Sequence, residues 1–462
     1  MFPLPKTGIP GATFPAVPSS TAASMMLGVL HQLRSTQLLP PAELQALQFR
    51  QLSELTSHAC RTVPFYANLL RQSGIKLTQP ISREIWHKVP ILNRQAVQEA
   101  GAALHARDLP QGHGSISTAT TSGSSGRPVT IRKTALAQFF WQCFVIREHE
   151  WQGRDFSALW MTILRDDLRT DPAHSNPLRR FPDWGEPLAA IYPTGPGLLL
   201  DYRVDVAEMF RIIIKEKPAY LTTFPSLLRE LLRESRASGV LPQGLLEVRS
   251  TGEALSTEIR SLCGELWGTK ASEIYSAAEI GIIAVPCPEQ NALHVQSEGV
   301  FLEILRDDGT PCASGEEGRV VLTPLHNFVM PLIRYELGDR ATLGAPCPCG
   351  RTLPVLRTIP GRARDMITTP TGERRFPFYS HGEMMKLDAI VQHQVAQTTI
   401  NQIEIRLVVR RPLTVTEETQ LLSIARAGLG TAHELRIVYC KEILRQESGK
   451  FAEFTNELNP SL

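Results

Sequence analysis

Apolar residues recur at helical spacing in two stretches near the N-terminus, 42–55 and 62–73, and in an aromatic-rich run at 139–146. From residue 205 onward, amphipathic helices alternate with short apolar strands. The predicted helices are 206–215, 225–235 and 256–267, and the predicted strands are 219–223, 245–249 and 272–275. This order predicts an α/β fold with a largely parallel sheet, in which ligand-binding loops follow the carboxyl ends of strands.

The pattern changes after about residue 334. Alternation at 403–409 predicts a strand, Thr414 and Glu417 form a capping box before a helix at 418–429, and 435–440 predicts another strand. We therefore expect three parts: a Pro/Gly-rich leader at 1–40, a large N-terminal domain of layered helices and sheets at 41–362, and a small, mobile α+β C-terminal domain at 363–462.

Composition narrows the class of protein. The 462 residues are 42% hydrophobic and 20% charged, as in ordinary soluble globular proteins. A net charge of only +2 without a basic block argues against nucleic acid as a partner, and the lack of a long apolar run argues against a membrane span. The N-terminus lacks the features of a signal peptide, and the eight cysteines are mostly scattered, so we expect a reduced, cytoplasmic protein.

A glycine- and serine-rich stretch lies between a polar segment and the strand-like residues 129–131. Glycines allow the chain to turn sharply, and successive backbone N–H groups with short hydroxyl side chains form a concave site suited to phosphate. The alternative is a linker or a hairpin turn. The residues concerned are Thr121, Ser122, Gly123, Ser124, Ser125 and Gly126.

Three further motifs carry groups suited to nucleotide chemistry. Tyr275 and Glu279 share a predicted loop after a strand, where an aromatic ring can stack on a base and a carboxylate can hold Mg²⁺. Asp339 follows a tight turn and can accept hydrogen bonds from ribose hydroxyls. Lys450 lies in a polar segment near the C-terminus. Taken singly, these residues are more typical of a capped loop, a turn and a solvated surface than of a nucleotide site.

Cysteine and histidine spacing gives a separate signal. Cys287 precedes His294 by seven positions, and Cys347 and Cys349 form a tight Cys-Pro-Cys-Gly knuckle. Three thiols and an imidazole suit a closed tetrahedral zinc site of structural type. The two pairs lie far apart in the chain, so four unrelated turn or core residues remain the alternative.

The ordered motifs resemble those of the adenylate-forming superfamily, which contains acyl-CoA synthetases, peptide-synthetase adenylation domains and luciferases. Within it the chain is similar to the phenylacetate-CoA ligase and CapK-like branch, over about residues 60–455. Motifs typical of that branch are Pro64-Phe65-Tyr66, Val89-Pro90-Ile91-Leu92, Thr223-Phe224-Pro225-Ser226 and the cysteine knuckle.

The resemblance implies a role for each motif. Thr121–Gly126 would hold the β- and γ-phosphates of ATP, and Glu279 would bind Mg²⁺. Lys450 would reach the α-phosphate and the substrate carboxylate from the small domain, which would move between two half-reactions. The remaining residues would line the adenine pocket (Gly252, Glu253, Tyr275 and Ser276) or bind the ribose (Asp339 and Arg362).

The resemblance implies an ATP-dependent ligase that adenylates a small, aromatic carboxylic acid and transfers the acyl group to coenzyme A. A homodimer is expected from the branch alone. An amine or a carrier-protein thiol as acceptor, and a nucleotide-binding paralogue without turnover, are the alternatives. Arg127 and Arg364, the latter in the hinge segment, depart from the residues common in relatives. The Pro/Gly-rich leader and the segment 373–378 leave the second half-reaction open. Phe139, Phe140 and Trp141 are either the floor of an aromatic-acid pocket or core residues.

Overall fold

The computed structural model describes residues 4–12, 14–72, 80–120, 129–166, 176–362, 366–375, 377, 384, 387–446 and 449–458. The chain divides into two compact units. The larger unit is built from most of the residues up to Ile359, and the smaller one is built mainly from those that begin at Pro360. This division lies close to residue 363, where the sequence analysis begins the C-terminal domain.

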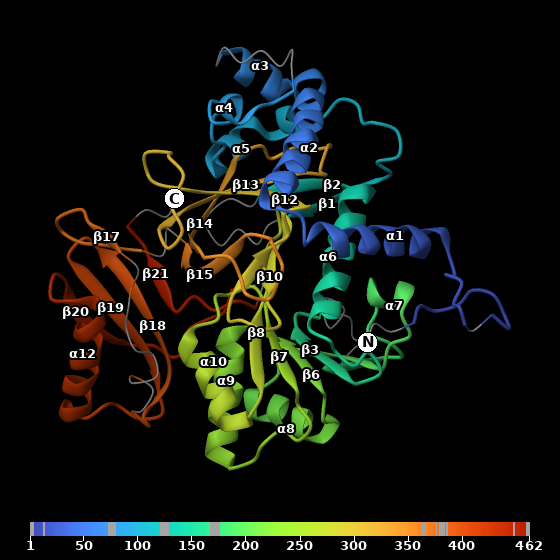
Figure 1. The fold of residues 1–462 in the computed structure, drawn as a ribbon. Helices are drawn as coiled ribbons and strands as arrows, with labels where there is room; N and C mark the ends of the chain where they lie inside the picture. The colour runs from blue at the N-terminus through green and yellow to red at the C-terminus, as the bar shows by residue number, and fades with distance from the viewer. Residues whose placement is uncertain are drawn as a thin grey trace. The chain divides into compact units, whose positions relative to one another are not determined.

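Within the described part of the larger unit, a six-stranded sheet has parallel central strands and one antiparallel edge strand. Its spatial order is β4 (Leu178–Phe181), β5 (Gly197–Asp201), β3 (Trp160–Leu164), β6 (Tyr220–Thr223), β7 (Glu247–Ser250) and β8 (Lys270–Glu273). Apolar side chains of the strands share one core with those of α8 (Val206–Glu216), α9 (Pro225–Ser238) and α10 (Thr257–Trp267). Figure 1 shows α9 and α10 beside β7 and β8. The α/β alternation predicted from residue 205 onward is confirmed.

The ends of these helices follow from local chemistry. Asp205 and Ser256 accept hydrogen bonds from backbone N–H groups in the first turns of α8 and α10. Pro225 begins α9, where its missing N–H costs nothing. Gly239 and Gly268 end α9 and α10 with positive φ angles of 69° and 64°.

A second sheet, of seven strands within the described ranges, has antiparallel pairs along most of its length. Its spatial order is β12 (Val300–Leu305), β13 (Glu317–Pro324), β14 (Tyr335–Leu343), β15 (Val355–Arg362), β11 (Leu293–Val295), β10 (Gly281–Pro286) and β9 (Tyr275–Ala277). A separate antiparallel pair, β1 (Ile116–Thr120) and β2 (Thr130–Thr134), flanks the glycine- and serine-rich stretch in the sequence.

The N-terminal segment contains a helix that the sequence analysis did not predict. Helix α1 (Thr21–Thr36) begins after the N-cap Ser20, whose side chain accepts from the Ala23 N–H at 3.1 Å. Its apolar face, which includes Met26 and Leu30, shares a core with α6 (Ala135–Trp151). The description of residues 1–40 as a Pro/Gly-rich leader is therefore wrong for this part, because the helical spacing of buried residues outweighs the surrounding Pro and Gly.

A buried ion cluster ties α6 to the six-stranded sheet. The Arg154 guanidinium donates to Glu148 in α6 and to Glu247 in β7, over distances of 2.6 to 3.0 Å. The three side chains are at most 8% exposed. Since a buried charge left without its partner is costly, this cluster fixes α6 against β7.

The smaller unit is α+β, as predicted. Its described residues include a four-stranded sheet with the spatial order β20 (Glu434–Tyr439), β19 (Gln402–Val409), β18 (Ile390–Thr399) and β21 (Phe454–Asn456). Helix α12 (Val415–Leu429) shares a core with this sheet. The capping box of Thr414 and Glu417 is present. A two-stranded pair, β16 (Ile367–Thr368) and β17 (Arg374–Arg375), completes its described strands.

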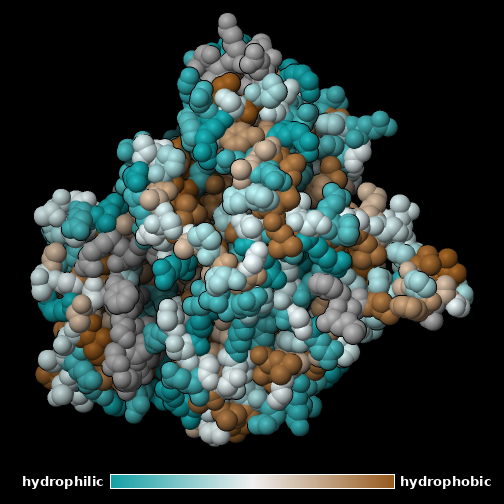
Figure 2. Space-filling view, viewed as in Figure 1, coloured by the Kyte–Doolittle hydropathy of each residue, from teal (hydrophilic) through white to brown (hydrophobic). Residues whose placement is uncertain are grey.

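The other described helices are α2 (Pro41–Thr62), α3 (Pro64–Gln72), α4 (Arg83–Trp86), α5 (Arg94–Ala100), a 3₁₀ turn at Gly101–Leu104 and α7 (Leu188–Ile191). Among the described residues, we find no helix with both the length and the apolar character needed to cross a membrane. On the face drawn in Figure 2, hydrophilic residues predominate and apolar ones lie in separate patches.

Candidate functional site

Two of the predicted motifs follow neighbouring strands of the six-stranded sheet. Strands β6, β7 and β8 run parallel, and the register pairs Thr223 with Ser250 and Ser250 with Glu273 at their carboxyl ends. The Gly252-Glu253 turn follows β7, and Tyr275 follows β8. Because parallel strands end at the same edge, the sheet brings both motifs to the position that the sequence analysis expects for a ligand site.

Glu253 secures this edge to the start of α9. Its carboxylate accepts from the Ser226 backbone N–H at 2.9 Å and from the Ser226 hydroxyl at 3.0 Å. Gly252, just before it, has a φ of 82°, which favours glycine. The Glu253 carboxylate therefore holds the turn against α9.

Tyr275 and Ser276 lie in a strand, at the point where the sequence analysis ends the strand 272–275 and begins a loop. They belong to β9, which pairs antiparallel with β10. Tyr275 is only 9% exposed and packs in a core with Ile283 and Val300, whereas Ser276 is exposed. The loop prediction is wrong for Ser276, because the chain here pairs with β10 in a β-hairpin and its side chains alternate between buried and exposed.

Glu279 lies in the turn between β9 and β10 and is 8% exposed. Its carboxylate forms an ion pair with Arg94, whose Nη1 atom lies 3.1 Å from Oε1. Arg94 is the first residue of α5, and the Asn93 side chain caps that helix. Burial lowers the pKa of Lys133 in β2, and the negative charge of Glu279 partly opposes this shift. Two cationic side chains thus surround the carboxylate predicted to bind a metal.

A cavity in the larger unit lies next to Glu279. The described lining combines charged and aromatic side chains, among them Lys133, Phe140, Trp141, Phe144, Glu279 and His326. Phe140 stacks on the imidazole of His326, with ring centroids 4.0 Å apart and planes 26° apart. Burial lowers the pKa of His326 to about 4, so this ring is neutral near pH 7. Phe140 and Trp141 therefore face a cavity, and Phe139 and Phe140 both pack against the core shared with α1.

The remaining nucleotide-binding candidates lie elsewhere in the chain. Asp339 is in β14 and is 8% exposed, and Arg362 is the last residue of β15. Lys450 is in the smaller unit and is half-buried. Its carbonyl accepts from the Gln446 N–H at 2.9 Å, and Gly449 before it has a φ of 88°. The six residues of the phosphate-loop prediction, Thr121, Ser122, Gly123, Ser124, Ser125 and Gly126, lie outside the described residues, as does Arg364.

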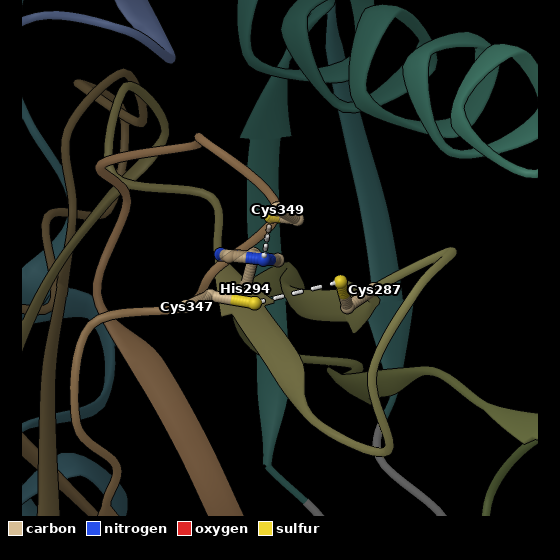
Figure 3. Close-up of side chains that lie close together, drawn as sticks. All are labelled: Cys287, His294, Cys347 and Cys349. Atoms are coloured by element: carbon tan, nitrogen blue, oxygen red, sulfur yellow. Dashed lines mark hydrogen bonds between the residues drawn. The ribbon is translucent and has the colours of Figure 1, made fainter.

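The structure brings the four cysteine and histidine candidates together. Cys287 follows β10, His294 is in β11, and Cys347 and Cys349 lie in the loop between β14 and β15. Their four donor atoms all lie within 4.8 Å of one another. The Cys287 and Cys347 Sγ atoms are 3.7 Å apart, and the Cys349 Sγ atom is 3.3 Å from the His294 Nε2 atom (Figure 3). The alternative of four unrelated residues is therefore wrong.

The relatives found by sequence and by structure are both CoA ligases. No protein-family model matches the chain. The chain is 25% identical over 391 residues to a phenylacetate-coenzyme A ligase of Thermus thermophilus. The aligned region covers 81% of this chain and 84% of that ligase. The chain is 24% identical over 436 residues to the Escherichia coli phenylacetate-coenzyme A ligase, which covers 88% and 93% of the two chains. The fold matches a solved 2-hydroxyisobutyryl-CoA ligase with a TM-score of 0.71 over 91% of both chains, at 18% identity.

The chain is similar in sequence to phenylacetate-coenzyme A ligases and has the fold of adenylate-forming enzymes. The resemblance on which the sequence analysis rests is thereby confirmed, together with its α/β fold and its small α+β C-terminal part. The structure places Gly252, Glu253 and Tyr275 at one edge of the sheet. The functions of the individual residues stay predictions.

The sequence analysis missed three charged or titratable residues around Glu279. Arg94, Lys133 and His326 belong to no motif that it identified, and Arg94 lies 185 positions from Glu279. A weak signal for Arg94 is its place at the start of a capped helix directly after the Val89–Leu92 motif. Only the tertiary structure shows that the Arg94 guanidinium contacts the Glu279 carboxylate.

Proposed function

We propose that this protein is an ATP-dependent carboxylate–CoA ligase that forms an acyl-adenylate. The observation that carries the proposal is its similarity to two phenylacetate-coenzyme A ligases over more than four fifths of the chain. A solved 2-hydroxyisobutyryl-CoA ligase of the same fold is in complex with an acyl-AMP, and in two of its structures CoA is bound as well. This similarity supports both half-reactions.

In the first half-reaction, a carboxylate oxygen attacks the α-phosphorus of ATP, and the bond to the pyrophosphate leaving group breaks. In the second, the CoA thiol loses its proton and attacks the acyl carbon, and AMP leaves. The first step develops negative charge on a group that is already anionic, so cations at the phosphates are needed to stabilise it. Lys450 is the residue we assign to the α-phosphate and the substrate carboxylate.

Glu279 is the residue we assign to Mg²⁺. A nearly buried carboxylate suits this hard cation, which prefers oxygen ligands. When bound with ATP, Mg²⁺ supplies charge neutralisation at the phosphate oxygens. The ion pair with Arg94 orients the Glu279 carboxylate, and a bound metal would compete with Arg94 for this carboxylate.

A small aromatic acid is our proposal for the substrate. The cavity next to Glu279 is lined by Phe140, Trp141 and Phe144, and aromatic walls with a few polar groups favour a flat apolar ligand. A panel of aromatic and aliphatic acids, assayed by pyrophosphate release, tests this assignment. If aliphatic acids alone were turned over, the aromatic proposal would be wrong while the ligase proposal would stand.

The test of the reaction is acid-dependent exchange of pyrophosphate into ATP. We expect exchange in the wild-type protein and a loss of about 10²- to 10³-fold in Lys450→Ala, since a positioned charge in the transition state is removed. Lys441→Ala, which changes an exposed lysine of the same unit, is the matched control and should keep the wild-type rate. An unchanged rate in Lys450→Ala would refute the role of this lysine.

The acceptor is tested separately. The purified protein is incubated with ATP and an acid that it accepts as substrate. Parallel reactions contain CoA, a phosphopantetheinylated carrier protein or an amine, and mass spectrometry identifies the products. A CoA thioester is the expected product. An acyl-carrier or amide product would show that the acceptor is a carrier-protein thiol or an amine instead of CoA. ATP binding without pyrophosphate exchange for any acid would support a non-catalytic paralogue.

A further inference from the structure

The cysteine–histidine cluster has no part in the proposed ligase reaction. Cys287 follows β10, and Glu279 lies just before the same strand. A strand of six residues spans about 20 Å, so the cluster and the candidate metal carboxylate are at opposite ends of it. The cluster therefore needs a separate explanation.

We infer that Cys287, His294, Cys347 and Cys349 form a structural zinc site. The distances fit this ion. Two sulfurs that each lie about 2.3 Å from a tetrahedral zinc are about 3.8 Å apart, and a sulfur and an imidazole nitrogen are about 3.6 Å apart. The observed separations are 3.7 Å between Cys287 and Cys347 and 3.3 Å between Cys349 and His294.

The same distances exclude a disulfide between Cys287 and Cys347. A disulfide places its two sulfurs about 2.0 Å apart. At 3.7 Å the sulfurs are instead at the separation of two ligands on one metal ion. Three thiolates with one imidazole in tetrahedral arrangement favour zinc over the hard cations that oxygen ligands select.

His294 is oriented as a zinc ligand requires. Its Nδ1 atom lies 3.3 Å from the Leu353 carbonyl oxygen, and the tautomer that donates Nδ1–H there leaves the Nε2 lone pair directed at the cluster. Metal-bound histidines usually donate their other N–H in this way, which fixes the ring. The edge of the Trp151 ring also packs against the imidazole, with centroids 5.7 Å apart and planes 86° apart.

The charge around the cluster suits an occupied site. Zinc with three thiolates and a neutral imidazole carries one net negative charge. Arg147 and Arg351 both act electrostatically on His294, and the Arg351 guanidinium lies 4.4 Å from the centre of the Trp151 ring. Two arginines near the ligands stabilise such an anionic centre.

The ion would fasten an irregular loop to the sheet. The loop between β14 and β15 contains Pro346 and Pro348, which have no backbone N–H to donate. Thr352 in this loop donates to the carbonyls of Gln37 and Leu39, which follow α1. Zinc would hold the loop to β10 and β11, and through Thr352 it would also fix the end of α1.

The test is elemental analysis of the untagged protein purified without chelators. We expect about one zinc per chain in the wild type and less than about 0.2 in Cys287→Ser and Cys349→Ser. Cys440→Ser, which changes a half-buried cysteine of the smaller unit, is the matched control and should keep the metal. Less than about half an equivalent of zinc in the wild type, or iron in its place, would overturn the inference.

A second measurement serves if the serine variants do not fold. Exchange of the wild-type metal for Co²⁺ should give the thiolate-to-cobalt charge-transfer absorption of a tetrahedral sulfur site. Removal of the metal by a chelator should lower the midpoint of thermal unfolding by roughly 5 °C or more, and Zn²⁺ should restore it. No cobalt uptake, or an unchanged midpoint after complete metal removal, would refute a structural site.

Discussion

The two ends of strand β10 carry candidate metal ligands of opposite kinds. At one end, four donor atoms from Cys287, His294, Cys347 and Cys349 face one another. At the other, the single carboxylate of Glu279 contacts the guanidinium of Arg94. The four residues of the cluster form a complete ligand set for a zinc ion. At the other end, the Arg94 guanidinium already contacts an oxygen of the one candidate ligand.

This difference distinguishes a structural metal site from a site for a metal that binds together with the substrate ATP. A structural metal is bound by a complete ligand set, which contributes to folding. A metal that arrives with ATP has to bind and leave in each cycle, so a protein that binds it through one carboxylate is not destabilised in its absence. Arg94 keeps the Glu279 charge compensated between cycles.

The largest predicted effect is a difference in ligase activity between variants at the two ends of strand β10. Glu279→Gln keeps the shape of the side chain and removes its charge, so we expect acid-dependent pyrophosphate exchange to fall by about 10²-fold or more. Zinc content should stay at the wild-type value. In Cys349→Ser the result should be reversed, with zinc lost and exchange per folded molecule within about threefold of wild type. If both variants lost both properties, the two ends would be one coupled site.

A smaller effect is predicted for Arg94. In Arg94→Gln, Mg²⁺ no longer competes with a guanidinium for Glu279, so we expect the protein with ATP to bind Mn²⁺ about fivefold more tightly, as for a pair worth about 1 kcal/mol. Electron paramagnetic resonance of free Mn²⁺ measures this without turnover.

Arg34→Gln is the control for that measurement. Arg34 is also a partly exposed arginine paired with a buried carboxylate, that of Glu150, at 2.8 Å. It should leave Mn²⁺ binding unchanged. Weaker Mn²⁺ binding in Arg94→Gln would show that Arg94 supports the metal complex and does not compete with it.

The predicted effect on stability is a pH dependence on the Glu279 side. His326 is neutral in the folded protein down to its pKa of about 4, whereas in the unfolded chain it takes up a proton below about 6.5. Its contribution to stability is therefore present above pH 6.5 and is lost as the pH falls toward 4, by roughly 2 kcal/mol between pH 6.5 and 5.

Thermal unfolding measured at pH 7 and pH 5 checks this expectation. The midpoint should decrease less between the two pH values in His326→Gln than in the wild type. His31→Gln, which changes an exposed histidine, should follow the wild type. An equal decrease in all three proteins would contradict the assignment to His326.

The sequence by itself determined the fold class and most of the elements. Helical and alternating apolar spacing is a local property, so it predicted α8, α9, α10 and the strands between them within a few residues. It failed where local signals conflicted. Helix α1 was hidden by Pro- and Gly-rich neighbours, and Ser276 was assigned to a loop because a short hairpin strand has too few residues to show a period.

The tertiary structure alone decided which candidate residues meet. Cys287 and Cys347 are 60 positions apart, and they come together because β11 pairs with β15 in a fixed register, His294 opposite Val355. Arg94 and Glu279 are 185 positions apart and meet through packing of α5 near the β9–β10 turn. Such contacts depend on strand order and helix packing, which local periodicity does not encode. Sequence spacing therefore identified the four candidate zinc ligands, and only the fold showed that they lie close together.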